Sequence, residues 1–207
     1  MRAPYALLTM LAVGVAGCGS GGGRSPQSVL SRARSDADRA TSVHVAGTLT
    51  ENGVRLGIDL RLARGAGATG SITEHGSTLR VVRTGGTVYV AGGAPLYSHL
   101  GATPAAARLL AGRWLKASAT RPGLAPVAAA TDQQKLLAEL LDVSATKLSG
   151  PRTVVLTDPP GQLVVRSRTP QYPLSLSTPS AHLRFSGWNV PVTLTAPSRS
   201  IDTSRLG

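Results

Sequence analysis

The residue types that most often carry out chemistry are scarce and scattered in this chain. The sequence contains one cysteine, Cys18, and four histidines that show neither HxH nor HExxH spacing: His44, His75, His99 and His182. It has no Gly-x-Ser-x-Gly segment for a serine nucleophile, and its glycine-rich stretches lack the Lys-Ser/Thr pair of a phosphate-binding loop. We therefore expect no catalytic residue, no metal site and no cofactor, and a protein that is not an enzyme.

Cys18 itself ends a segment that is typical of exported proteins. A basic start at Arg2, an apolar run over residues 7–13 and small residues before the cysteine form a secretory signal layout. The apolar run is shorter than the roughly 20 residues that cross a bilayer, which disfavours a membrane-spanning helix. The stretch Val15-Ala16-Gly17-Cys18 resembles a bacterial lipobox, whose cysteine sulfur receives a diacylglyceryl group. The alternative is a plain signal peptide with an incidental cysteine.

The lipobox reading predicts a signal peptide over 1–17, lipid attachment at Cys18 through palmitate-type acyl chains, and an anchor on the outer face of the cell membrane. Residues 18–24 are rich in glycine and predict a flexible tether, and residues 25–207 have a length that suits a single domain. A lone cysteine permits no internal disulfide. The formal net charge is +12, but the basic residues are spread along the chain and aromatics make up only 3%, so we expect no nucleic-acid partner.

The hydrophobic pattern predicts helices grouped between two sets of strands. Apolar residues recur at helical spacing over 26–40, and alternation from Ser42 to Val90 predicts a meander of about five antiparallel strands. Short helices follow over 95–100 and 104–110, then a strand over 113–117, a loop with a little helix over 122–127, and a helix that Asp132 caps. Further strands are predicted over 153–157, 163–167, 174–177, 182–188 and 192–195. The predicted fold class is α+β, with a helical block inserted between two halves of one antiparallel sheet.

Three short motifs lie within this order: Leu110-Ala111-Gly112-Arg113-Trp114-Leu115-Lys116, Tyr172-Pro173-Leu174 and Phe185-Ser186-Gly187-Trp188. Together with the lipobox and the meander, they resemble the LppX/LprG-type lipoproteins of actinobacteria, distant relatives of the LolA/LolB lipoprotein carriers, over roughly residues 25–197. The resemblance implies a strongly curved antiparallel half-barrel with helices on its concave face and an apolar cavity between them. It also implies that the protein binds a lipid or glycolipid, moves it outward across the cell envelope, and has envelope proteins as further partners.

The residues that would line such a cavity share an apolar side chain and a place on the inward face of a predicted strand or on the leucine stripe of the helix after Asp132. They are Leu56, Ile58, Leu60, Leu79, Val81, Val88, Val90, Leu136, Leu137, Leu140, Leu163, Val165, Leu174, Leu176, Leu183 and Phe185. The alternative is an ordinary packed core, because alternating aliphatic residues fill most protein interiors. A packed core would favour a second function, an envelope interaction or sensing module that uses the fold as a rigid protein-binding surface.

Overall fold

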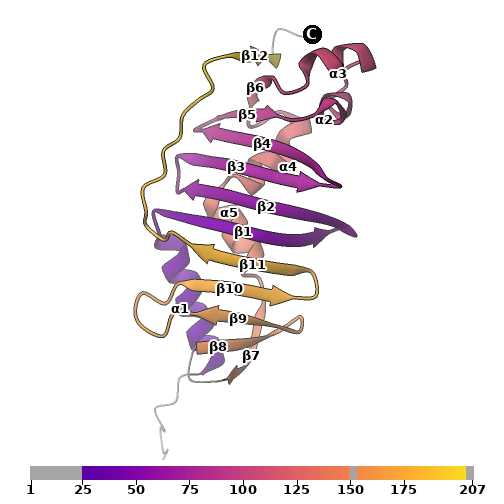
Figure 1. The fold of residues 1–207 in the computed structure, drawn as a ribbon. Helices are drawn as coiled ribbons and strands as arrows, with labels where there is room; N and C mark the ends of the chain where they lie inside the picture. The colour runs from indigo at the N-terminus through magenta and orange to yellow at the C-terminus, as the bar shows by residue number, and fades with distance from the viewer. Residues whose placement is uncertain (1–24, 150–152, 204–207) are drawn as a thin grey trace, which may run out of the picture.

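A computed structural model of the protein describes residues 25–149 and 153–203 (Figure 1). Its helices are α1 (Pro26–Arg39), α2 (Ala94–His99), α3 (Pro104–Leu110), α4 (Ala125–Ala130) and α5 (Gln133–Leu140), with a 3-10 turn η1 (Pro122–Leu124) before α4. Its strands are β1 (Ser42–Glu51), β2 (Val54–Ala63), β3 (Gly67–Glu74), β4 (Ser77–Thr84), β5 (Thr87–Ala91), β6 (Trp114–Ser118), β7 (Ser144–Ser149), β8 (Thr153–Asp158), β9 (Gly161–Val165), β10 (Pro173–Thr178), β11 (Ala181–Ser186) and β12 (Ser200–Asp202).

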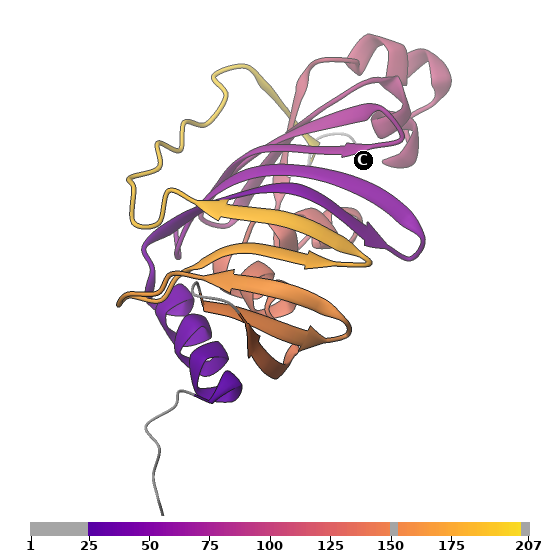
Figure 2. The same cartoon turned by 60° about the horizontal axis from the view of Figure 1, so that its bottom comes forward.

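The described strands form one twelve-stranded sheet in the order β12-β6-β5-β4-β3-β2-β1-β11-β10-β9-β8-β7. Neighbours are antiparallel except β12, which lies parallel to β6. Because β1 pairs with β11, the strands before and after the helical block meet side by side in the sheet. The sheet is strongly curved and helices lie within its curve (Figure 2). This arrangement confirms the predicted α+β fold class, a curved antiparallel sheet of the half-barrel type with helices on its concave face.

Helix α1 begins where the sequence predicts and packs against β7, β8 and β10. The Ser25 hydroxyl accepts a hydrogen bond from the backbone N–H of Ser28 at 3.1 Å, which satisfies one of the free donors of the first turn. Near the other end, the buried Asp36 carboxylate accepts hydrogen bonds from the backbone N–H of Gln171 and from the Arg39 guanidinium, both at 2.7 Å. The helix is therefore fixed to the loop before β10 by a buried polar contact as well as by packing.

Alternation along the strands gives the sheet an apolar inner face and a polar outer face. In β2, Leu60 and Leu62 are fully buried, whereas Asp59 and Arg61, which alternate with them, are exposed. Burying a leucine side chain contributes about 1.5–3 kcal/mol, so the inner face supplies most of the stabilisation that holds the helices in place. The pattern of β2 repeats in β11, where Leu183 and Phe185 are buried and Arg184 is exposed.

Two strands differ from the sequence prediction. The strand predicted over 192–195 is wrong: residues 190–197 form no strand, since Pro191 and Pro197 have no N–H to donate to a ladder, and the last strand lies at β12 instead. This segment runs past the ends of several strands to reach β12 (Figure 1). Strand β7 was not predicted, because only Ala145 and Leu148 point inward and a bulge between Ala145 and Lys147 interrupts the alternation.

Gly70 in β3 occupies a position that tolerates no side chain. Its φ is +151°, and a Cβ there would lie 2.0 Å from the backbone oxygen of Asp59 in the neighbouring strand. We expect Gly70→Ala to lower the free energy of unfolding by about 2–4 kcal/mol, measured by urea denaturation followed by circular dichroism. Gly57→Ala is the matched control, since its Cβ would make ordinary contact with the Thr73 side chain at 3.5 Å. A loss as large at Gly57 as at Gly70 would contradict this steric account.

Candidate functional site

The predicted cavity residues are brought together on the inner face of the sheet and on α5. Twelve of the sixteen are buried in one apolar core: Ile58, Leu60, Val81, Val88, Val90, Leu136, Leu137, Leu163, Val165, Leu176, Leu183 and Phe185. Leu79 and Leu140 are partly buried and pack against the same core, and Leu56 is also partly buried. A common apolar interior is therefore present, and its use as a lipid cavity stays a prediction.

Leu174 is the one residue of this set that lies outside the interior. It is 37% exposed, whereas Leu176 two positions later is buried. Val165 pairs with Pro173 while Val164 pairs with Ser175, so Leu174 is the extra residue of a bulge in β10. A bulge changes which face a side chain points to, and simple alternation therefore misplaced Leu174.

The inner face is incompletely covered at the end where the β1–β2 and β3–β4 hairpins turn. Leu49 lies opposite Leu56 across the first hairpin, and Ile72 lies opposite Leu79 across the second. All four side chains are partly exposed, and both hairpins project beyond α5 in Figure 1. Leu96 of α2 is also partly exposed and packs against the same core. We call Leu49, Leu56, Ile72, Leu79 and Leu96 the open apolar strip.

Three members of the open apolar strip, Leu49, Ile72 and Leu96, were not among the predicted cavity residues. The signal for two of them was present in the sequence. The turns at Asn52-Gly53 and His75-Gly76 fix the hairpin registers, and those registers place Leu49 and Ile72 beside Leu56 and Leu79. Leu96 lies on a short helix whose position depends on tertiary packing.

The helical cover over the inner face is thin at α4. No residue of α4 is buried, although Leu136 and Leu137 of α5 are. One side chain ties this part of the cover to the sheet: Arg83 of β4 donates a hydrogen bond to the backbone oxygen of Ala128 at 2.9 Å and lies 3.5 Å from the Asp132 carboxylate. These polar contacts add to the packing of the partly buried Val127 and Ala128 against the core.

The outer face carries a polar cluster around His44. His44 Nε2 lies 2.8 Å from Asp59 Oδ1, and its Nδ1 lies 3.3 Å from the Ser186 hydroxyl. These groups lie on neighbouring strands of the outer face, where the backbone amides take part in the sheet ladders and are not free to stabilise an oxyanion. We interpret the three side chains as a cross-strand polar network of the outer face.

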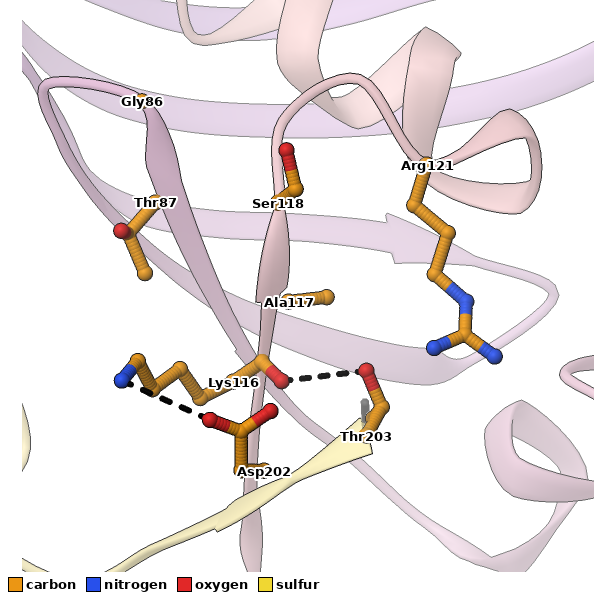
Figure 3. Close-up of a pocket in the computed structure, with 8 residues that line it drawn as sticks. All are labelled: Gly86, Thr87, Lys116, Ala117, Ser118, Arg121, Asp202 and Thr203. Carbon is orange, nitrogen blue, oxygen red and sulfur yellow. Dashed lines mark hydrogen bonds and ion pairs between the residues drawn. The ribbon is translucent and has the colours of Figure 1, made fainter. Parts of the chain in front are cut away.

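A polar pocket of about 610 Å³ lies where β12 pairs with β6 (Figure 3). Lys116 Nζ lies 3.6 Å from the Asp202 carboxylate, and the Thr203 hydroxyl donates to the backbone oxygen of Lys116 at 3.1 Å. Lys116 and Arg121 point to opposite sides of β6 in Figure 3. A second hollow of about 330 Å³ lies between Thr48, Arg55 and Thr73 on the outer face. None of the predicted cavity residues lines either of the two hollows. Neither hollow is the predicted apolar cavity.

The lipid attachment prediction falls on Cys18, which lies outside the described residues. The same is true of the signal peptide over 1–17 and of the whole tether over 18–24. Within residues 25–149 and 153–203, none of the helices is long and apolar enough to cross a bilayer. In that part of the chain, no cluster of three or more His, Cys, Asp or Glu side chains is arranged to hold a metal ion.

No protein-family model and no curated protein sequence matches the chain. Among solved structures, the crystal structure of LprF from Mycobacterium bovis is similar, with 16% sequence identity and a TM-score of 0.47. The match covers 83% of this chain and 96% of that chain. At this identity the likeness concerns the path of the chain and not what either protein binds.

Proposed function

We propose that the protein is a membrane-anchored lipoprotein that holds the acyl chains of a lipid or glycolipid against the inner face of its curved sheet, for transfer across the cell envelope. The single observation that carries the proposal is the open apolar strip. The strip continues the buried interior outward to a partly exposed edge, so an acyl chain laid along it would contact aliphatic side chains throughout.

The chemistry of the interior suits an acyl chain. Leucine, isoleucine and valine form the strip and most of the core behind it, and these side chains offer dispersion contacts without polar groups that need partners. The thin cover at α4 supports the same proposal, since a helix with no buried residue can shift without uncovering core side chains of its own. A lipid would then enter from the strip and extend beneath α4 and α5.

In this proposal Cys18 keeps the domain at the membrane that supplies the lipid. A single acyl chain gives only marginal membrane binding, whereas the two chains of a diacylglyceryl group hold a protein durably. About seven residues of glycine-rich tether reach roughly 15 Å, which leaves the domain free to tilt with respect to the bilayer. The anchor and the strip thus serve one task, the capture of lipid at a surface.

Native mass spectrometry tests the proposal directly. The chain purified from an actinobacterial host should carry a non-covalent lipid that survives transfer to the gas phase and is released by collisional activation. Its mass should vary in steps of two methylene groups, as bacterial acyl chains do. Protein that stays free of lipid after incubation with a total lipid extract from the same host would overturn the proposal and favour the protein-binding alternative.

A further inference from the structure

The α2–α3 pair forms a protruding tip beside the open end of the half-barrel (Figures 1 and 2). At this tip Leu109 is 73% exposed, the highest value among the large hydrophobic side chains found exposed in the described residues. Single exposed apolar residues are common on protein surfaces. Leu109 differs from an ordinary exposed leucine because the residues near it in the chain are basic.

The chain around the tip is basic throughout. From His75 to Thr131 the sequence contains no Asp or Glu, and its basic residues there are Arg80, Arg83, Arg108, Arg113, Lys116 and Arg121. Arg83 and Lys116 pair with acidic residues from outside this stretch, Asp132 and Asp202. Arg108 precedes Leu109 directly, and both it and Arg113 are exposed.

Hydrogen bonds fix the backbone of the tip to its neighbours. The buried Tyr97 hydroxyl of α2 donates a hydrogen bond to the backbone oxygen of Arg113, and Gly112 N–H donates to the backbone oxygen of Gly92 at 2.8 Å. Arg80 also reaches this loop: its Nη2 lies 3.4 Å from the backbone oxygen of Gly112, and its guanidinium stacks 5.1 Å from the Trp114 ring. The Arg80 guanidinium therefore lies at the loop that follows Leu109, and Arg113 belongs to the same loop.

We propose that the α2–α3 tip docks on an anionic lipid bilayer, with Leu109 inserted among the headgroups and Arg80, Arg108 and Arg113 against lipid phosphates. An exposed apolar side chain with exposed arginines near it in the chain complements an anionic headgroup layer with acyl chains beneath it. Docking by the tip would bring the open apolar strip close to the bilayer. The use of this closeness for lipid uptake rests on the proposed function, whereas the docking of the tip does not.

Binding to lipid vesicles tests the proposed docking of the tip. The protein for this test begins at residue 18 and carries Cys18→Ser. It contains every described residue and can receive no acyl chain. It should co-sediment with phosphatidylglycerol-containing vesicles and not with pure phosphatidylcholine vesicles. Arg108→Gln and Arg113→Gln should each weaken binding about fivefold, as expected for a basic residue near an anionic surface. Arg55→Gln and Arg61→Gln, exposed on the outer face, remove the same charge elsewhere and should change binding less than about twofold.

A fluorescent label tests whether Leu109 enters the bilayer. Because the Cys18→Ser chain has no other cysteine, Leu109→Cys gives a single attachment site for an environment-sensitive dye. The dye should shift to shorter wavelength on anionic vesicles. A dye at Val190→Cys, which is 57% exposed on the segment between β11 and β12, should not shift. Equal binding to neutral vesicles, no binding at all, or an unshifted dye at position 109 would overturn the proposal. Lipid carried in native mass spectra is unaffected by these results, so the two proposals fail separately.

Discussion

The fraction of protein that carries lipid should be at least tenfold lower for Leu79→Asp than for the unchanged protein. Leu79 lies in the open apolar strip, partly exposed and directly opposite Ile72. A carboxylate at this position would lie against an acyl chain, and even an uncharged polar group left without a partner there costs about 1–3 kcal/mol. Because the leucine is only partly buried, the domain should still fold. The measurement is the fraction of lipid-loaded protein in native mass spectra.

Thr78→Asp provides a matched control for this prediction. Thr78 precedes Leu79 in β4 but points to the outer face, where it pairs with Thr73. The control therefore adds the same charge to the same strand on the opposite side of the sheet. It should keep its lipid, and both variants should unfold within about 1 kcal/mol of the unchanged protein. Equal lipid occupancy in the two variants would show that the strip does not contact the ligand.

Cys18→Ala should move the protein almost completely from the membrane fraction to the soluble fraction of a bacterial cell. With the thiol removed, no diacylglyceryl group can be attached, and none of the helices in residues 25–149 and 153–203 can replace it as a membrane span. Cell fractionation followed by immunoblotting measures the distribution. Mass spectrometry of the N-terminal peptide of the unchanged protein should show the added lipid on Cys18.

Ser20→Ala is the control for the anchor, because it alters the tether and leaves the lipobox intact. It should stay with the membrane. A high-salt wash separates the anchor from the proposed contact at the α2–α3 tip, since salt screens arginine–phosphate attraction and leaves inserted acyl chains in place. If Cys18→Ala protein remained with salt-washed membranes as the unchanged protein does, Cys18 would not be the anchor.

Most of the fold was predictable because its elements are local and strongly patterned. In β2, Leu60 and Leu62 alternate with Asp59 and Arg61, and such alternation fixes both the strand and the face that it buries. Helix α1 has a capping serine, a proline in its first turn and apolar residues at helical spacing. Each of these signals operates within about ten residues, and each led to an element that the structure contains.

The parts that sequence could not supply depend on contacts between distant residues. The parallel pairing of β12 with β6 places Ile201 opposite Leu115, and no local pattern specifies that partner. The bulge that exposes Leu174 depends on how β9 and β10 align. The same limit applies to the candidate site, because the partial exposure of Leu56 and Leu79 depends on where the helical cover ends.

The pairing of β1 with β11 has a consequence for how the chain reaches its folded state. His44 lies opposite Ser186, so a central ladder of the sheet joins residues about 140 positions apart. Contacts of such sequence separation slow folding, because a long loop must close before they contribute stability. Without residues 181–186, which form β11, the strands from β12 to β1 and the strands from β10 to β7 would not be hydrogen-bonded to each other. Both β1 and β10 would then be edge strands. Completion of the sheet therefore waits until residues 181–186 have emerged from the ribosome or the export channel.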